Sequence, residues 1–198
     1  MIEIKNLPNT KPYKLFEEYY DLARSFNQKP IDAISISSLS LKSNEVESRF
    51  VNLKYVMSEE WIFFSNYKSP KAKNFDEHNQ ISALLYWPKI DLQIRIKAKI
   101  KKTSSEFSDK YFRLRQKEKN ALAISSMQSQ EIKSHDEVVK NFKNTLANKR
   151  LNKRPDYWGG FSFTPYYFEF WKGHEFRLNK REVFIKEKNC WTNHKLQP

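Results

Sequence analysis

Leu92-Gln93-Ile94-Arg95-Ile96-Lys97-Ala98-Lys99-Ile100 is the stretch of this sequence that says most about its fold. Apolar and polar residues alternate along the whole stretch. An alternation of period two is typical of a β-strand that has one face in the core and one in solvent. We therefore expect a strand over residues 92–100.

Shorter segments of the same kind precede this strand and are separated by polar turns. They cover residues 33–39, 49–56, 61–65 and 81–87. Before them, apolar residues recur at helical spacing over about 12–27, with Pro12 near the first turn, where proline is well tolerated. The N-terminal half thus predicts one amphipathic helix followed by a run of strands.

Helical signals follow the central strand, and strands return after them. Thr103–Glu106 and Ser134–Glu137 each have the spacing of a capping box ahead of apolar residues, which predicts a helical insert over about 104–148. The basic stretch 148–155 is typical of an exposed connector, and strands resume over 160–198. Strands on both sides of an insert favour a single α+β domain over residues 1–198, mainly β, built on an antiparallel barrel or sheet.

The three glycines of the chain all lie within residues 159–173, and Arg177 and Arg181 follow them. A chain that otherwise lacks glycine is expected to use it where the backbone needs positive φ or close approach. Large aromatic residues and two arginines around such positions would suit a planar, anionic ligand. The alternative interpretation is a tight β-hairpin flanked by core aromatics.

Composition limits the classes of function. The formal net charge is +13 with a pI of about 9.6, and lysine is scattered along the chain, which suits either phosphorylated small molecules or nucleic acid. No apolar run approaches the roughly 18 residues of a membrane span, the N-terminus lacks a secretory pattern, and Cys190 is the single cysteine. We expect a cytoplasmic protein. The four histidines are isolated, so no metal site is expected.

Charged residues inside apolar segments are the candidate binding groups. Arg49 and Lys54 lie in one predicted strand, five residues apart, which places them on opposite faces of a regular strand. Either that strand twists or bulges, or the two cations serve different groups, or this is an edge strand with solvated charges. Tyr111 and Arg115 are four apart in a predicted helix, where a phenol and a guanidinium could grip one phosphate.

Taken together, these segments resemble the pyridoxamine 5′-phosphate oxidase family, FMN-dependent enzymes that make pyridoxal 5′-phosphate. The resemblance runs from about Tyr13 to Pro198. The segments that carry it are Arg49–Lys54, Phe63–Asn66, Ser69–Ala72, Gln93, Tyr111–Phe112, Gln128–Ser129, Tyr157–Phe161, Glu169–Trp171, and Arg177–Leu178 with Arg181.

The resemblance implies a split antiparallel β-barrel of Greek-key type with peripheral helices, acting as a homodimer with FMN at the subunit interface. The matching cofactor-binding positions are Arg49, Phe50, Val51, Asn52, Leu53, Lys54, Phe64, Ser65, Lys71, Gln93, Gln128, Ser129, Trp171 and Arg181. Arg49 and Lys71 would pair with the flavin phosphate. The matching substrate-binding positions are Lys54, Tyr111, Arg115, Lys119 and Arg177, and Arg177 and Asn179 match the catalytic positions.

The implied reaction oxidises pyridoxamine or pyridoxine 5′-phosphate: hydride passes from substrate C4′ to flavin N5, and O₂ then reoxidises the flavin and yields H₂O₂. Three positions depart from the family pattern: Pro70 replaces an arginine, Lys119 a serine and Asn179 a histidine. An amide cannot titrate near neutrality as an imidazole does. These departures leave open a flavin-binding relative with a different or lost substrate. The net charge of +13 leaves open a second alternative, a basic β-barrel that binds nucleic acid.

Overall fold

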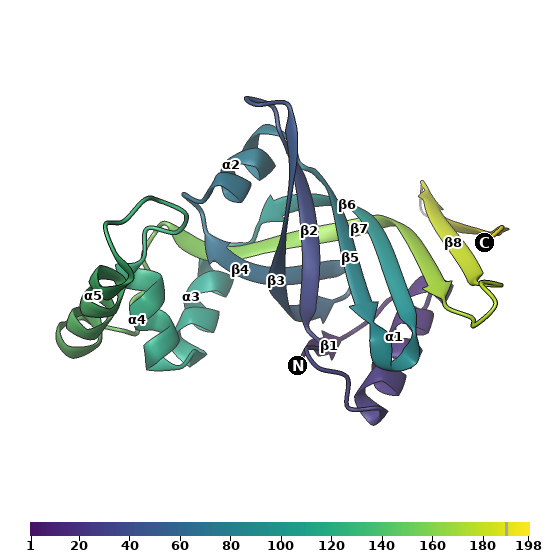
Figure 1. The fold of residues 1–198 in the computed structure, drawn as a ribbon, viewed down its shortest axis with the longest axis horizontal. Coiled ribbons are helices and arrows are strands. Elements are labelled where there is room, and N and C mark those ends of the chain that lie inside the picture. Colours follow the sequence, from purple (N-terminus) through teal and green to yellow (C-terminus); the bar gives the residue numbers. More distant parts are fainter. Residues whose placement is uncertain (189) are drawn as a thin grey trace.

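The fold is built on a ring of six strands, drawn in Figure 1, in a computed structural model that describes residues 1–188 and 190–198. Around the ring, each strand pairs antiparallel with the next. In ring order the strands are β2 (Ala33–Ser40), β3 (Glu45–Met57), β4 (Glu60–Asn66), β7 (Trp158–Lys172), β6 (Leu92–Lys102) and β5 (Gln80–Trp87). The predicted mainly β, antiparallel split barrel is confirmed.

Strand β7 changes partner halfway along its length. Residues 158–163 pair with β4 and close the ring, whereas residues 167–172 pair with β8 (Lys180–Glu187), which in turn pairs with β9 (Cys190–Leu196). Pro165, which has no N–H to donate, lies at the changeover, where the register with β6 also slips by one residue. The barrel is split at this point, and β8 and β9 lie at the end of the molecule opposite the helical insert (Figure 1).

The N-terminal helix α1 (Lys11–Ser25) packs its apolar face on the barrel core. Tyr13, Phe16, Tyr20 and Ala23 are buried, and their spacing of three and four residues places them on one face. The Phe16 ring centroid lies 4.4 Å from that of Trp61, a core residue of β4. The helix expected over about 12–27 is therefore present, with its apolar face inward.

The helical insert consists of α3 (Ser105–Leu114), α4 (Lys117–Ser125) and α5 (His135–Asn148). Ser134 caps α5 as predicted, because its hydroxyl accepts from the Glu137 N–H. The cap of α3 is Ser104, which accepts from the Phe107 N–H, one residue beyond the predicted capping position. Three short elements were not predicted: β1 (Glu3–Lys5), α2 (Pro70–Glu77) and the 3₁₀ turn η1 (Pro88–Ile90).

The glycines serve close approach, not unusual backbone angles, since none has positive φ. Gly159 and Gly160 lie inside β7, so the hairpin interpretation is wrong for them. A Cβ on Gly160 would lie 2.5 Å from the Thr103 Oγ1 and 2.9 Å from its methyl carbon. The missing side chain lets the segment that leads from β6 into α3 lie directly on β7.

Within the described ranges, none of the helices has the length and apolar character needed to cross a bilayer.

Gly160→Ala should lower the free energy of unfolding by about 1–3 kcal/mol, because the added methyl overlaps Thr103 in a packed region. The measurement is denaturant unfolding at constant m-value. Thr103→Ala removes both overlapping atoms, so the double variant should be less destabilised than the sum of the two single variants. Strictly additive losses would show that this contact does not require glycine.

Candidate active site

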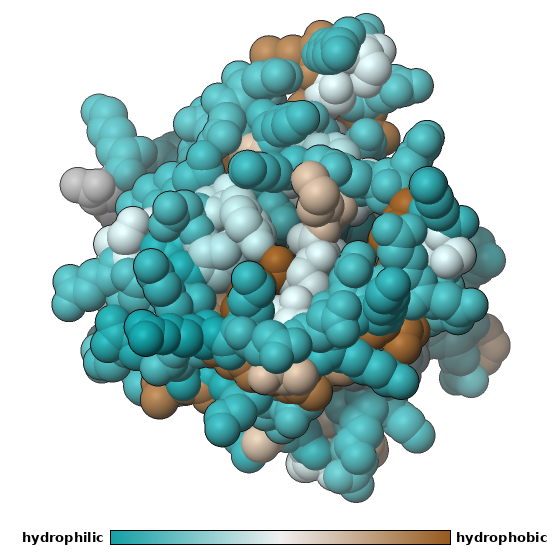
Figure 2. Space-filling model, turned by 90° about the vertical axis from the view of Figure 1, so that its left-hand side faces the viewer, coloured by the Kyte–Doolittle hydropathy of each residue, from teal (hydrophilic) through white to brown (hydrophobic). Residues whose placement is uncertain are grey.

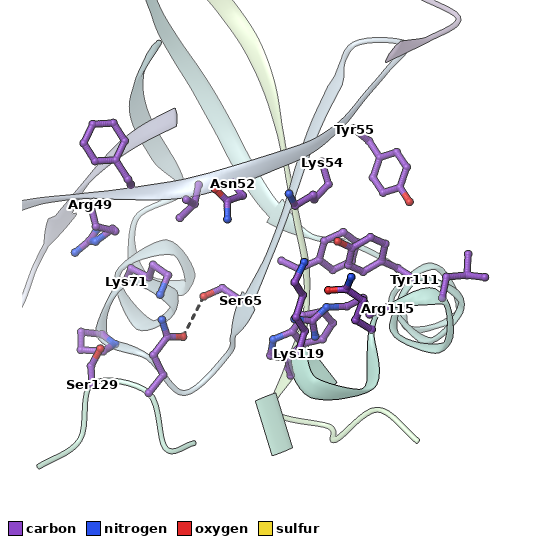
Figure 3. A pocket seen from close by; sticks show the side chains of 18 of the residues that line it. Arg49, Asn52, Lys54, Tyr55, Ser65, Lys71, Tyr111, Arg115, Lys119 and Ser129 are labelled. Atoms are coloured by element: carbon purple, nitrogen blue, oxygen red, sulfur yellow. Dashed lines mark hydrogen bonds between the residues drawn. The ribbon is translucent and has the colours of Figure 1, made fainter. Parts of the chain in front are cut away.

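A cleft of about 830 Å³ opens between the barrel and the helical insert. Figure 2 views the molecule from the side of the insert, where hydrophilic residues cover most of the surface. The sequence-predicted residues that line the cleft are Arg49, Phe50, Val51, Asn52, Lys54, Phe64, Ser65, Lys71, Tyr111, Arg115, Lys119, Gln128 and Ser129. Figure 3 shows that they converge from β3, β4, α2, α3, α4 and the segment after α4.

Lys71 and Arg49 form a pair of like charges at one end of this cleft. The Lys71 side chain is buried in the first turn of α2, and its Nζ donates to the Ser69 Oγ at 3.1 Å. Burial and the neighbouring charge of Arg49 lower the pKa of Lys71 from 10.5 to about 8. Within the described ranges no carboxylate lies within ion-pair distance of Lys71. A buried cation without a counter-ion is costly, so this end is suited to an anion.

Arg49 is held by contacts on its own side of the cleft. Its Nη1 donates to the Ser38 Oγ at 2.9 Å, and its guanidinium pairs with the Glu47 carboxylate. The Ser38 hydroxyl also accepts from Asn74 Nδ2 at 3.4 Å. These contacts fix the direction of the guanidinium beside Lys71.

A bulge in β3 lies between Arg49 and Lys54, which both line the cleft. Leu53 pairs with Phe63 and Tyr55 with Ile62, which leaves Lys54 as the extra residue between two successive pairs. The strand therefore bulges, which is one of the interpretations open at the sequence level. The Lys54 Nζ pairs with Asp32 Oδ2 at 2.9 Å.

Aromatic rings form a wall at the other end of the cleft. The rings of Phe64 and Tyr111 are stacked with centroids 3.6 Å apart and an interplanar angle of 8°. The Trp158 ring lies nearly parallel to Phe64, at 5.4 Å and 11°. Burial raises the pKa of Tyr111, which keeps the phenol protonated as a hydrogen-bond donor at neutral pH.

Arg115 lies against this wall. Its guanidinium carbon is 4.4 Å from the Trp158 ring centroid, in cation–π geometry, and burial lowers its pKa. Arg115 is the first residue after α3 and has extended backbone angles, so it does not share a helix face with Tyr111 as predicted. Together with Lys54 and the exposed Lys119, it still gives this end of the cleft three cations.

The segment after α4 closes the cleft near Ser65. The Ser65 hydroxyl donates to Gln128 Oε1 at 3.3 Å (Figure 3). The Asn66 N–H donates to the same oxygen at 3.4 Å. Ser129 has a φ of 67°, which turns the chain at this point. Gln128 and Ser129 are thereby brought within reach of the Arg49 and Lys71 end.

Six predicted site residues do not line this cleft in the single chain. Leu53 is fully buried and belongs to the barrel core, because the pleat turns its side chain inward. Gln93, Trp171 and Arg181 are aligned across β6, β7 and β8. Arg181 Nε donates to the buried carboxylate of Glu169 at 2.8 Å.

Arg177 and Asn179 lie in the connection between β7 and β8. Arg177 is exposed with a φ of 59°, and Asn179 Oδ1 accepts from the His174 N–H at 3.1 Å. The cations that the resemblance assigns to FMN or substrate are thus divided: those on β3, on α2, after α3 and on α4 line the cleft, whereas Arg181 lies on β8 at the other end of the molecule (Figure 1).

Sequence reasoning also missed residues that line the cleft, namely Glu47, Tyr55, Pro70, Leu114, Gln116 and Trp158. The sequence could have indicated Trp158, since it lies in the motif 157–161 directly before two glycines. It could also have indicated Glu47, an acidic residue two positions from Arg49 and therefore on the same face of the strand. Leu114 and Gln116 become visible only once α3 and α4 are placed.

Comparison with solved structures defines the class of fold. PhzG from Burkholderia lata, solved with tetrahydrophenazine-1-carboxylic acid, superposes with a TM-score of 0.89 at 23% identity, covering 96% of this chain and 94% of that one. An FMN-binding protein related to pyridoxamine 5′-phosphate oxidase from Nostoc punctiforme gives a TM-score of 0.80 at 10% identity, covering 96% and 99%. The chain therefore has the split-barrel fold of these proteins.

Sequence comparison identifies the family. The family described as "Pyridoxamine 5′-phosphate oxidase" matches residues 31–148, and "Pyridoxine 5′-phosphate oxidase C-terminal dimerisation region" matches residues 158–198. The pyridoxine/pyridoxamine 5′-phosphate oxidases of Colwellia psychrerythraea and Christiangramia forsetii are 33% and 36% identical, over 96% and 94% of this chain and 88% of each relative. The chain belongs to the pyridoxamine 5′-phosphate oxidase family. The match to a dimerisation region supports a homodimer.

Lys71→Met should stabilise the ligand-free protein by roughly 1–3 kcal/mol at pH 7, because it removes a buried cation and one pKa unit corresponds to about 1.4 kcal/mol. The cost of the charge is fully present below pH 8 and disappears as the pH rises towards 10.5, where the unfolded chain also loses the proton. The stability difference should shrink over that range in thermal melts. The exposed Lys73→Met on the same helix is the control, and an equal effect there would contradict the assignment.

Proposed function

We propose that this protein is an FMN-dependent oxidase that converts pyridoxamine 5′-phosphate or pyridoxine 5′-phosphate to pyridoxal 5′-phosphate. The observation that carries the proposal is the pairing of two cationic groups in one cleft. Lys71 and Arg49 form one group, and Lys54, Arg115 and Lys119 form the other. A phosphorylated cofactor and a phosphorylated substrate that react with each other need two such anion sites side by side.

The residues at the Lys71 end suit the flavin phosphate. Lys71 is buried and unpaired by a carboxylate within the described ranges, and the Ser65 hydroxyl lies nearby in the cleft. Each charge-assisted hydrogen bond to a phosphate contributes about 1.5–3 kcal/mol. Lys71, Arg49 and Ser65 would hold the phosphate, and Gln128 and Ser129 would contact the rest of the cofactor. When bound, FMN supplies a hydride acceptor that O₂ reoxidises, with release of H₂O₂.

The residues at the other end suit the substrate. Lys54, Arg115 and Lys119 would bind the substrate phosphate, and the protonated phenol of Tyr111 would donate to it. The stacked rings of Phe64, Tyr111 and Trp158 keep water away from these charges on one side, which strengthens them. Fixing the phosphate in this way orients the ring that it carries.

A homodimer would complete the site. Gln93, Trp171 and Arg181 share one row at the end of the molecule away from the cleft, and Trp171 and Arg181 lie in the segment that matches the family's dimerisation region. We propose that this row, with Arg177 and Asn179 beside it, contacts the flavin and substrate held by the partner copy. Arg177 would lie over the substrate ring, and cytoplasmic O₂ would be the final acceptor.

The test of the proposal is a spectrum followed by a peroxide assay. The protein incubated with FMN and then desalted should stay yellow. Addition of pyridoxamine 5′-phosphate should then yield one H₂O₂ for each pyridoxal 5′-phosphate formed. Pyridoxamine, which lacks the phosphate, should react poorly. Yellow protein that releases no peroxide would favour a flavin-binding relative with another substrate. Colourless protein with steeply salt-dependent binding of DNA or RNA would overturn the proposal.

Asn179→His should raise kcat/KM for pyridoxine 5′-phosphate, since an imidazole supplies a group that titrates near neutrality where the amide does not. Steady-state kinetics with Asn179→Ala as the matched control separate a chemical gain from loss of the His174 contact. If His and Ala behave alike and neither differs from the parent protein, position 179 does not belong to the substrate site.

A further inference from the structure

Arg115 has few contacts of its own that would hold it in place. It follows the last residue of α3, its backbone is extended, and its guanidinium lies on the face of Trp158. Within residues 1–188 and 190–198, no carboxylate lies within ion-pair distance of it. Stacking on a ring leaves a guanidinium free to slide and rotate in the ring plane. A fixed direction therefore requires a hydrogen bond from another residue.

Asn120, on α4, makes that hydrogen bond. Its side chain is buried, and its Oδ1 accepts from Arg115 Nη1 at 3.1 Å. Its Nδ2 donates to two backbone carbonyls, those of Phe112 and Leu151, each at 2.8 Å. Because the two carbonyls can only accept and the guanidinium can only donate, the amide nitrogen must face the carbonyls and its oxygen must face Arg115.

The two carbonyls come from different parts of the chain. Phe112 is in the last turn of α3, and Leu151 is in the connector between α5 and β7. Asn120 therefore connects α4 to the end of α3 and to the connector before β7. These contacts fix its amide, which in turn holds the Arg115 guanidinium in one direction. No other side chain of similar size offers two donors and one acceptor: aspartate would set a carboxylate against two carbonyls, and leucine would remove all three hydrogen bonds.

We propose that Asn120 is a positioning residue that acts through Arg115, holding its guanidinium at the angle needed to bind the substrate phosphate. This rests on the proposed function, which assigns the Arg115 end of the cleft to that phosphate. Asn120 does not itself line the cleft. Its effect is on discrimination between phosphorylated and unphosphorylated ligands.

A double-mutant cycle tests the proposal on the FMN-loaded protein. Dissociation constants for pyridoxal 5′-phosphate and for pyridoxal are measured in the parent, Asn120→Ala, Arg115→Ala and the double variant. Asn120→Ala should raise the dissociation constant for pyridoxal 5′-phosphate by about tenfold or more and that for pyridoxal only slightly, because only the phosphate contact is lost. In the Arg115→Ala background the same change should add nothing. Asn148→Ala, an exposed asparagine on α5, is the matched control and should match the parent.

Equal weakening of both ligands by Asn120→Ala, unchanged affinities, or losses that multiply in the double variant would each overturn the positioning role. If Asn120→Ala does not fold, Asn120→Ser gives the same test, since its hydroxyl can still donate to one of the two carbonyls but does not supply the amide oxygen that holds Arg115. The cycle is repeated with inorganic phosphate as the probe. A parent protein that binds inorganic phosphate through Asn120 and Arg115 but not pyridoxal 5′-phosphate would refute the proposed substrate and keep the positioning role. Binding of neither probe would overturn both.

Discussion

Strand β7 pairs with two different strands along one of its edges, and most of the architecture depends on this change of partner. Its first half closes the ring between β4 and β6, and its second half leaves β4 and pairs with β8 instead. The close approach of Thr103 to Gly160 fixes the first half against the start of the insert. Pro165 and the register slip beside it make the change of partner possible. Cleft and C-terminal arm are thus placed at opposite ends of one continuous strand.

The electrostatics of the cleft follow from where carboxylates are present and where they are not. Lys54 and Arg49 each have an acidic partner, Asp32 and Glu47, whereas no carboxylate of a described residue pairs with Lys71, Arg115 or Lys119. The net positive field is therefore strongest at two places, one at each end of the cleft. Lys71 and Arg115 are also partly withdrawn from water, and this burial lowers the pKa of each because it disfavours an uncompensated charge.

Much of the fold was predictable because its signals are local. The alternation over residues 92–100 and the apolar spacing of α1 depend on neighbours a few residues away, and both predictions are confirmed. Helix α2 was missed because it is short and begins at a proline in a lysine-rich stretch. The capping serine of α3 was misplaced by one because Thr103, Ser104 and Ser105 all have suitable hydroxyls.

The candidate site was predictable in its residue types but not in its assembly. The spacing of Arg49 and Lys54 left open whether the two cations share a site, and the fold shows that both line one cleft. The bulge between them depends on the pairing of β3 with β4 rather than on β3 alone. Nothing in the sequence pointed to Asn120, because its orientation depends on hydrogen bonds to two backbone carbonyls, those of Phe112 and Leu151. The family resemblance supplied candidate residues, and only the fold shows which of them share a cleft within one chain.

The extra residue in β3 also has a consequence for how the chain tolerates change. Without Lys54, residues Leu53 and Tyr55 would be adjacent and would still face Phe63 and Ile62, so the pleat would be regular and Val56 could keep its buried position. The barrel could therefore close without the extra residue, whereas the cleft would lose one of its cations. In a family comparison, constant spacing between Arg49 and Lys54 would be a stricter mark of this cleft than the identity of the residues between them.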